Sequence, residues 1–326
     1  MKEKQKELAL GIDLGGTKIL TAVIDDEGNL LSREHSITPA SEGPEAVVRA
    51  VLKSTEHSLQ QAGVSVKDVE AIGIGAPGLS NPETGILYTS PHLPGWRDAP
   101  LRNIIEQKLG GRAFLINDAN AAAVGELHFG AGRGARHFIY ITVSTGIGGG
   151  IIINGKIYTG ASGTAGELGH MVIDDDGPTC NCGNRGCWET LASGTALAKA
   201  ARTRIKDGAV TSIPKYAGDP DRINAEAVHQ AALDGDKLAL ELIDRVAYYL
   251  GVGLANLVNL YNPEVIVIGG GLSNIGDMLL QPAYAEAGRR AFPQPYGAVR
   301  FARAELGRDS GVIGAATYAL ERIRAI

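Results

Sequence analysis

Short apolar runs that end in glycine-rich turns recur along the chain, with helical patterns between them. In the first 120 residues this pattern predicts strands and two helices, followed by an alanine-rich helix that begins at about Ala119. The helix at 44–62 has the clearest ends, because Pro44 suits a first turn and Gly63 lies just past the last residue. The predicted strands are 8–13, 19–25, 30–37, 69–76 and 112–118, and the second helix is near 99–109.

The second half of the chain repeats this order of elements. A strand is predicted at 138–144, a glycine turn at 145–150, and two short strands after it. A long apolar helix is expected near 238–260. After it, the segment PEVIVIGGGLS at 263–273 mirrors the segment VEAIGIGAPGLS at 69–80. The matching order and spacing indicate an internally duplicated α/β fold.

The two copies define the expected domains. Residues 1–118 form a smaller N-terminal α/β domain, and residues 119–308 form a larger one that includes the cysteine-rich segment described below. We place the boundary at about Asp118–Ala119, because the copies follow one another without a linker rich in serine or proline.

Composition and charge narrow the class of protein. Hydrophobic residues make up 44% of the chain and charged residues 21%, which is typical of soluble globular proteins. A net charge of -5 argues against nucleic acid or an anionic membrane surface as a partner. We find no apolar run of membrane-spanning length and no signal-peptide core after the basic N-terminus. All 3 cysteines cluster within eight residues, which fits a reducing compartment, so we expect a cytoplasmic protein.

The first glycine turn has the composition of a phosphate-binding turn. It lies between two strands, which excludes the Walker-type loop, since that loop needs a helix after its lysine. Glycines still let backbone N–H groups approach an anion closely. A threonine hydroxyl and a lysine add donors, and the aspartate could hold a hydrated Mg²⁺. A plain tight hairpin is the alternative. The residues are Asp13, Gly15, Gly16, Thr17 and Lys18.

A second turn of this kind occupies the equivalent position of the other copy. It contains Ser144, Thr145 and Gly146. A pair of turns in equivalent repeat positions favours phosphate binding over two plain hairpins, and we expect them to hold the triphosphate of ATP in a cleft between the domains. The third glycine turn, which could let an adenosine lie against the backbone, is Gly269, Gly270 and Gly271.

The most specific feature of the sequence is a histidine followed by three closely spaced cysteines: His170, Cys180, Cys182 and Cys187. Three thiolates and one imidazole make a closed tetrahedral Zn²⁺ site, and the glycines at 183 and 186 allow the turns that it needs. Because no ligand position remains for water, the zinc is expected to be structural. The alternative is three ordinary buried cysteines with an unrelated histidine.

Polar residues at a strand end suggest an acceptor site. Asp118 follows a predicted strand, where a carboxylate can take the proton of an attacking hydroxyl and orient its oxygen. A helix N-cap is its structural alternative. Glu167 and Glu189 flank the cysteine cluster and suit neighbouring sugar hydroxyls, although ordinary surface charge is the simpler interpretation. His170 could bind zinc through one nitrogen and the sugar through the other.

These motifs together resemble the ROK family (repressors, open reading frames and kinases), and most closely its bacterial glucokinases. The resemblance runs over essentially the whole chain, from DLGGTK at 13–18 to DSGVIGAA at 309–316. Its most specific parts are GELGH at 166–170 and CNCGNRGCWE at 180–189, and NDANAAA and STGIGGG also match. His92, in SPHLPGW, departs from the asparagine expected in many members.

The resemblance implies an actin-like, hexokinase-like (ASKHA) α/β fold with two duplicated domains around a cleft and a C-terminal helix at about 309–326 that returns to the first domain. It also implies phosphorylation of a hexose hydroxyl by ATP and Mg²⁺, most simply of glucose to glucose 6-phosphate, with a structural Zn²⁺. A homodimer or homotetramer is expected. Asp118 would be the catalytic base, and the other sugar-binding residues would be Asn117, Glu167, His170, Glu189 and Gly78.

Other functions share parts of this pattern. A kinase for N-acetylmannosamine, N-acetylglucosamine or fructose would use the same carboxylates and histidine, and polyphosphate could replace ATP. A sugar-responsive repressor would need an N-terminal helix-turn-helix, whereas the first strand is expected near residue 8. A filament-forming or chaperone ATPase would have no use for sugar ligands beside a zinc site. The zinc site is expected to position only the sugar ligands. We therefore expect both predicted triphosphate turns to lie outside it.

Overall fold

The computed structural model describes residues 6–219 and 222–326. Contacts divide the chain into two compact units. Unit 1 comprises Met1–Arg136, Gly150–Gly166 and Ala304–Ile326, and unit 2 comprises His137–Gly149 and Glu167–Arg303. Residues 119–136 and 150–166 thus join unit 1, whereas the boundary between functional domains at 118–119 stays a prediction.

A five-stranded sheet forms the centre of unit 1. Its order is β3 (Glu34–Ile37), β2 (Lys18–Asp25), β1 (Leu8–Leu14), β4 (Ala71–Ala76) and β8 (Ala113–Asn117). The first three strands pair antiparallel, and β1, β4 and β8 run parallel. A small second sheet consists of β5 (Leu79–Asn81), β6 (Ile86–Thr89) and β7 (Arg97–Ala99).

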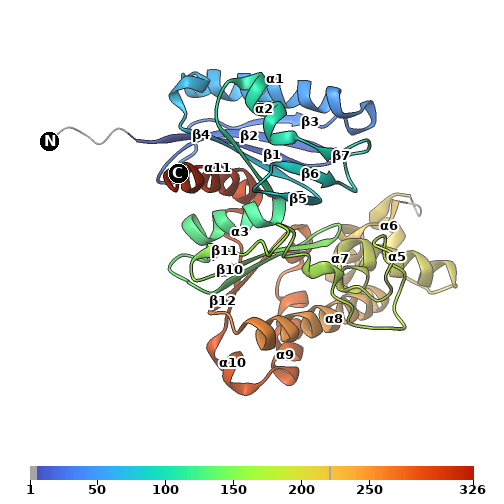
Figure 1. Ribbon diagram of the computed structural model, residues 1–326. Helices are drawn as coiled ribbons and strands as arrows, with labels where there is room; N and C mark the ends of the chain where they lie inside the picture. The colour runs from blue at the N-terminus through green and yellow to red at the C-terminus, as the bar shows by residue number, and fades with distance from the viewer. Residues whose placement is uncertain (1–5, 220–221) are drawn as a thin grey trace. The chain divides into compact units, whose positions relative to one another are not determined.

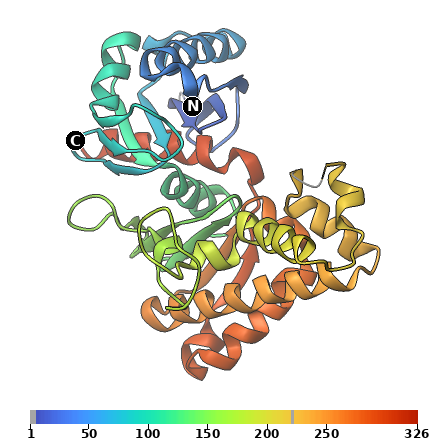
Figure 2. The same cartoon turned by 90° about the vertical axis from the view of Figure 1, so that its right-hand side faces the viewer.

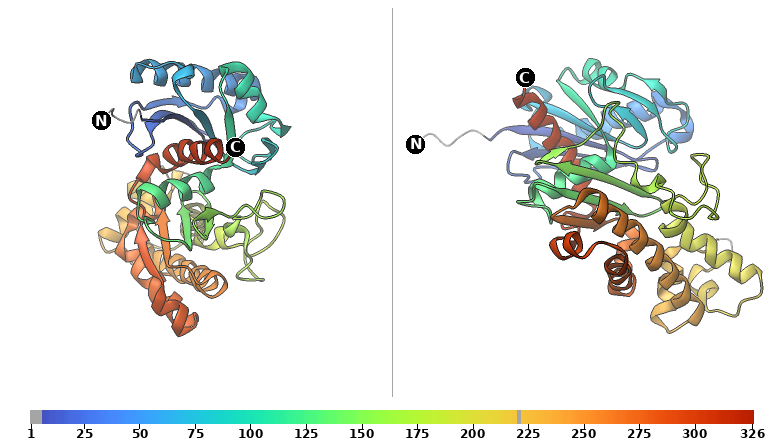
Figure 3. Two further views of the ribbon diagram at one scale, coloured as in Figure 1. Left: turned by 60° about the vertical axis from the view of Figure 1, so that its left-hand side comes forward. Right: turned by 60° about the horizontal axis from the view of Figure 1, so that its bottom comes forward.

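Alternation along the strands gives the central sheet two apolar faces. Leu10 and Ile12 belong to the core shared with α1 (Pro44–Ala62) and α2 (Leu101–Leu109). Ala9 belongs to the core under α11 (Ser310–Arg324), whereas α3 (Asp118–Phe129) packs against α11. Figure 1 and the left view of Figure 3 show α1 and α11 on opposite faces of the sheet. The C-terminal helix is therefore part of unit 1.

Glycines in the strands let α11 approach the sheet closely. A Cβ atom at Gly11 would lie 2.2 Å from the carbonyl oxygen of Val312, and one at Gly73 would lie 1.8 Å from that of Ala315. Such distances leave no room for any side chain at either position. The glycines in these apolar strands thus serve helix packing rather than turns.

The second five-stranded sheet repeats the plan of the first, which confirms the predicted duplication. Its order is β11 (Lys156–Ile157), β10 (Ile147–Ile153), β9 (Phe138–Val143), β12 (Val265–Gly269) and β13 (Arg300–Arg303). β12 runs parallel to β9 and β13, as β4 does to β1 and β8.

Helix α8 (Lys237–Tyr261) organises the helical part of unit 2. Its buried residues recur at helical spacing and pack against several other helices (Figure 2). Trp188 is fully buried against α8, where a Cβ atom at Gly253 would lie 2.0 Å from the indole ring. The remaining helices are α4 (Trp188–Ala192), α5 (Gly194–Lys206), α6 (Ile213–Ala217), α7 (Ala225–Leu233), α9 (Asp277–Arg290) and α10 (Pro293–Ala298).

Two local predictions need correction. The third strand is shorter than predicted, because Leu30 forms only an isolated bridge with Ile24 and regular pairing starts at Glu34. The glycine turn predicted at 145–150 ends early, because β10 already begins at Ile147. The helix predicted at 44–62 is confirmed at both ends. Among the described residues, no helix combines the length and the apolar character that a membrane crossing requires.

Candidate active site and metal centre

The first predicted phosphate turn joins β1 to β2 in unit 1. The N–H of Gly15 donates to the carbonyl of Lys18 at 2.9 Å and closes the turn. Thr38, the residue after β3, stabilises the turn with two hydrogen bonds. Its hydroxyl donates to the carbonyl of Gly15 at 2.7 Å, and its N–H donates to the carbonyl of Thr17 at 3.0 Å. Within the described residues the N–H groups of Gly16 and Thr17 have no acceptor. These two donors are available to an anion.

Asn117, rather than Asp118, caps α3, so the N-cap alternative for Asp118 is wrong. The Asn117 side-chain oxygen accepts from the N–H groups of Ala119 at 2.9 Å and Asn120 at 3.1 Å. Its amide donates to the carbonyl of Gly78 at 3.2 Å, which ties the glycine turn after β4 to the end of β8. Asp118 Oδ1 also accepts from the N–H of Ala119, at 2.8 Å, and the rest of the carboxylate remains for other partners.

Two carboxyl groups of unit 1 have raised pKa values. Burial raises the pKa of Asp118, while the N–H of Ala119 and the charge of His92 act in the opposite direction. Burial, with the charge of Asp118 as a second cause, raises the pKa of Asp13 to about 7. A carboxylate with a raised pKa is a stronger base, which suits proton removal from a hydroxyl.

The two predicted glycine turns of unit 2 lie side by side. They follow β9 and β12, which are parallel neighbours with Gly269 opposite Thr142. The N–H of Ser144 donates to the carbonyl of Gly146 at 2.9 Å and shapes the first turn. Gly270 has φ +86, and a Cβ atom there would lie 2.4 Å from the carbonyl oxygen of Val143. A Cβ atom at Gly271 would lie 3.8 Å from the Ser144 hydroxyl, so the two predicted turns adjoin each other.

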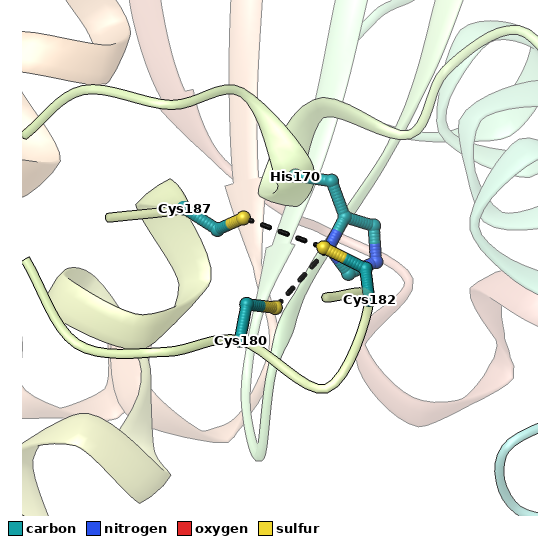
Figure 4. Close-up of side chains that lie close together, drawn as sticks. All are labelled: His170, Cys180, Cys182 and Cys187. Carbon is teal, nitrogen blue, oxygen red and sulfur yellow. Dashed lines mark hydrogen bonds between the residues drawn. The ribbon is translucent and has the colours of Figure 1, made fainter. Parts of the chain in front are cut away.

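The predicted metal ligands converge in unit 2 (Figure 4). One ligand atom from each of His170, Cys180, Cys182 and Cys187 lies within 4.8 Å of the others. His170 Nδ1 lies 3.6 Å from Cys180 Sγ, and Cys182 Sγ lies 3.6 Å from Cys187 Sγ. Tetrahedral Zn–S bonds of about 2.3 Å place two sulfur atoms roughly 3.8 Å apart. The donor set and its spacing therefore fit a zinc ion.

The thiols of the cluster have different electrostatic environments. Burial raises the pKa of Cys187 to about 12. The N–H of Asn184 is the main cause that lowers the pKa of Cys182 to about 7. A buried thiol of this kind becomes a thiolate when a divalent cation supplies compensating charge.

Tight backbone contacts shape the loop that carries the cysteines. Gly183 and Gly186 have φ values of +97 and +67, and a Cβ atom at Gly186 would lie 1.5 Å from the carbonyl oxygen of Asp174. Directly after Cys187, the N–H of Trp188 donates to Met171, and its indole N–H donates to Tyr249 on α8. The cluster is thus fixed to the longest helix of the unit.

Two predicted sugar ligands lie beside this cluster. His170 Nε2 lies 4.0 Å from a carboxylate oxygen of Glu167, whereas its Nδ1 faces Cys180. The two ring nitrogens therefore have the separate partners that a shared zinc and sugar ligand requires. Glu189 Oε1 lies 3.8 Å from Cys180 Sγ.

Glu189 also contacts the second glycine turn, so a predicted sugar ligand connects this turn to the zinc cluster, although the turn contributes none of the four metal ligands. Its Oε2 accepts from the N–H of Ile147 at 3.2 Å, and a Cβ atom at Gly146 would lie 2.2 Å from the same oxygen. The close approach depends on Gly146 having no side chain, which sequence spacing over 43 residues did not reveal. Thr38 was missed for a similar reason, because its contact with Gly15 spans 23 residues.

Comparison with known proteins identifies the family. A sequence model of the ROK family matches residues 9–322, so the chain belongs to the ROK family. The glucokinase of Thermotoga maritima is 37% identical over 317 residues, which cover 96% of this chain and 98% of that protein. The xylose repressor of Bacillus spizizenii is 33% identical over 318 residues, which cover 98% of this chain and 78% of that protein.

A solved structure supports the same assignment. The ROK family glucokinase from Streptomyces griseus, in complex with glucose and AMPPNP, superposes with a TM-score of 0.83 at 36% identity. The match covers 96% of this chain and 99% of that one. This likeness confirms the predicted hexokinase-like fold.

Proposed function

We propose that the protein transfers the γ-phosphoryl group of ATP to a hexose hydroxyl, with glucose as the expected acceptor and glucose 6-phosphate as the product. One observation in particular carries the proposal. Asn117 takes the capping role at the start of α3, and the adjacent Asp118 carboxylate, with its raised pKa, is left for the acceptor hydroxyl. The curated relative of similar length from Thermotoga maritima is a glucokinase.

Asp118 acts as base and positioner in this reaction. The acceptor oxygen forms a bond to the γ-phosphorus, the bond from that phosphorus to the β,γ-bridging oxygen breaks, and the hydroxyl proton passes to Asp118. The transition state of phosphoryl transfer is loose, so the orientation of the attacking oxygen contributes more than its deprotonation. Asn117 and Gly78 would complete the acceptor contacts on this unit.

Unit 2 supplies the remaining sugar ligands. Glu167, His170 Nε2 and Glu189 present two carboxylates and one N–H donor, a set that recognises neighbouring sugar hydroxyls. Zinc bound by His170, Cys180, Cys182 and Cys187 would fix these side chains and take no part in the chemistry. Zn²⁺ has no open position there.

The glycine turns would bind the nucleotide. The free N–H groups of Gly16 and Thr17 suit phosphate oxygens, with the Lys18 ammonium nearby. Asp13 would hold a hydrated Mg²⁺, which neutralises charge on the phosphates. In unit 2, Ser144, Thr145 and Gly146 would bind phosphate, and Gly269, Gly270 and Gly271 would lie against the adenosine.

A coupled assay over a panel of hexoses with ATP tests the proposal. We expect glucose to give the highest kcat/KM among glucose, fructose, N-acetylglucosamine and N-acetylmannosamine. Asp118→Asn should lower kcat by at least about 10²-fold, whereas Glu56→Gln, an exposed carboxylate on α1, should leave it unchanged. More than a tenth of wild-type kcat in Asp118→Asn removes Asp118 from this role. Activity on none of these sugars defeats the proposed function and leaves sugar sensing, as in the xylose repressors, as the alternative.

The cellular context belongs to the same proposal. We infer a cytoplasmic enzyme that works as a homodimer or homotetramer, with sugar and nucleotide as its ligands and neither nucleic acid nor membrane as a partner. Light scattering of the purified protein measures the oligomeric state. Polyphosphate offered in place of ATP in the same coupled assay tests the choice of phosphoryl donor.

A further inference from the structure

The segment 90–96, between β6 and β7 of unit 1, carries an exposed histidine directly before two buried anchors. Leu93 is 1% exposed and Trp96 is 4% exposed, and both belong to the core that α1 and α2 share with the central sheet. His92 is exposed. Backbone bonds from Leu93 to Ser90 and from Trp96 to Leu93 fold the segment back on itself. The backbone of His92 is therefore fixed by the core, although its imidazole is free to meet a ligand.

This segment packs directly on the phosphate turn. A Cβ atom at Gly16 would lie 2.5 Å from Cβ of His92 and 3.0 Å from its carbonyl oxygen. The backbones of Gly16 and His92 are therefore in direct contact, and a shift of the segment 90–96 would disturb the phosphate turn. Gly16 lacks a side chain because His92 occupies that space.

The same segment also contacts the acceptor side of unit 1. A Cβ atom at Gly78 would lie 2.8 Å from Cα of Ser90, and the carbonyl of Gly78 accepts the hydrogen bond from Asn117. Asn117 adjoins Asp118. The phosphate turn, the segment 90–96, the Gly78 turn and the end of β8 therefore form one continuous packed surface within unit 1.

Electrostatics agree with this placement. The charge of His92 is among the causes that lower the pKa of Asp118 against the effect of burial. The backbone of His92 touches Gly16 and its charge acts on the Asp118 carboxylate, so His92 is linked both to the phosphate turn and to the assigned base.

We propose that His92 is a catalytic residue, whose imidazole N–H donates a hydrogen bond to the phosphoryl group during its transfer. The inference rests on the proposed function. The migrating group must pass from the turn that holds the nucleotide to the oxygen that Asp118 orients. His92 touches that turn, and its segment packs on Gly78, which is bonded to the neighbour of Asp118. His92 transfers no proton in this step, since Asp118 takes the proton of the acceptor. Donors aimed at charge that develops in the transition state are worth about 10²- to 10³-fold in kcat.

Three variants test the role. His92→Ala removes the donor, His92→Gln keeps a neutral donor of similar reach, and His35→Ala removes an exposed histidine of β3 as the matched control. We expect His92→Ala to lower kcat about 10²-fold with KM values for sugar and ATP within about threefold of wild type. His92→Gln should recover part of the loss, and His35→Ala should behave as wild type.

A binding measurement separates catalysis from scaffolding. The affinity for MgADP with aluminium fluoride and the sugar, which mimics the transferring phosphoryl group, should fall in His92→Ala by a factor similar to kcat. The affinity for a non-hydrolysable ATP analogue should stay within about threefold. A kcat within threefold of wild type overturns the proposal. A loss confined to the sugar KM, or one matched by a lower melting temperature in His92→Ala and His92→Gln alike, also overturns it.

The same experiments distinguish this proposal from the function on which it rests. A wild-type protein without kinase activity on any hexose defeats the proposed function itself. An active wild-type protein with an equally active His92→Ala variant defeats only the role of His92.

Discussion

The carboxylate of Glu126, on α3, accepts a hydrogen bond from the N–H of Leu306 at 2.9 Å, 180 residues further along the chain. Its other oxygen accepts from the N–H groups of Ala131 at 3.0 Å and Glu305 at 3.1 Å. The side chain is fully buried. A Cβ atom at Gly130 would lie 2.0 Å from the same carboxylate. One buried acceptor thus fixes the backbone near two of the four places where the chain passes between its units, after 136 and before 304.

Glu126→Ala should therefore lower the free energy of unfolding by about 3 kcal/mol, because three N–H groups lose their acceptor. Glu126→Gln should also destabilise, since the amide group turns a donor toward one of these N–H groups. Urea titration measures both changes. The control is Glu305→Ala, which removes an exposed ion pair with Arg133 and should cost less than about 1 kcal/mol. A cost for Glu126→Ala no larger than that of the control would contradict the anchoring role.

The parts of the fold that local chemistry determines were predictable from the sequence. Pro44 and Gly63 set the ends of α1 because the first fits a helical first turn and the second adopts the left-handed conformation. The duplicated sheet followed from two copies of the same hydrophobic order. The zinc ligands were predictable because Cys180, Cys182 and Cys187 are close in sequence as well as in space.

Contacts between distant segments were not predictable. Glu126 lies in an apolar helix, and two of its three N–H partners, Glu305 and Leu306, are distant in sequence, so only the tertiary structure shows why it is there. The sequence pattern predicts that Gly148, Gly149 and Gly150 prolong a turn, whereas the structure places them in strand β10. At Gly149 and Gly150, Leu168 and Ala123 leave no room above the strand, where a Cβ atom would lie 2.5 Å away.

The contact between Trp188 and Gly253 predicts that zinc retention by the metal cluster depends on its packing against α8. In Gly253→Ala, the new methyl group would lie 2.0 Å from the indole, so either Trp188 or α8 must shift. We expect destabilisation of about 1–3 kcal/mol, in the range of overpacked cores. Because Trp188 directly follows Cys187, zinc should also be lost faster to a chelator. Gly297→Ala is the control, since a Cβ atom there meets no neighbour within 4 Å. Equal stability and equal zinc loss in both variants would refute this dependence.

The raised pKa of Asp13 predicts that the stability of the protein free of nucleotide and metal depends on pH. Its pKa rises from 3.8 to about 7 on folding, so the folded state binds the proton more tightly than the unfolded state. This contribution is fully present below pH 4 and is lost as the pH rises through 7. Since Asp13 is only half-buried, we expect a loss of about 1–2 kcal/mol instead of the full value of the shift.

The comparison with Asp13→Asn isolates this contribution. The variant should gain stability relative to wild type between pH 4 and pH 8, because asparagine does not ionise. The control Glu56→Gln should run parallel to wild type over the same range. Parallel curves for Asp13→Asn and wild type would show that Asp13 titrates at the same pH in the folded and unfolded states.

Zinc and sugar binding should be coupled through His170 and Glu189. His170 turns Nδ1 toward Cys180 and Nε2 toward Glu167, and Glu189 approaches the sulfur of Cys180. Loss of a pure zinc ligand in Cys182→Ser should therefore disturb both sugar ligands. Changes in the groups that orient ligands around a metal typically cost about 10- to 100-fold. We expect the sugar KM to rise by about that factor, or activity to disappear.

The nucleotide KM should rise less, although it should not stay constant. Glu189 also accepts from the N–H of Ile147 beside the second glycine turn, whereas the first turn in unit 1 has no described contact with the cluster. Kinetics of folded Cys182→Ser at about 25 °C measure both KM values, and Asn181→Ser, on the same exposed loop, is the matched control. If zinc only pins a surface loop, Cys182→Ser should melt at a lower temperature with unchanged sugar kinetics. That outcome would show that the zinc has a structural role only and that sugar binding by His170 does not depend on it.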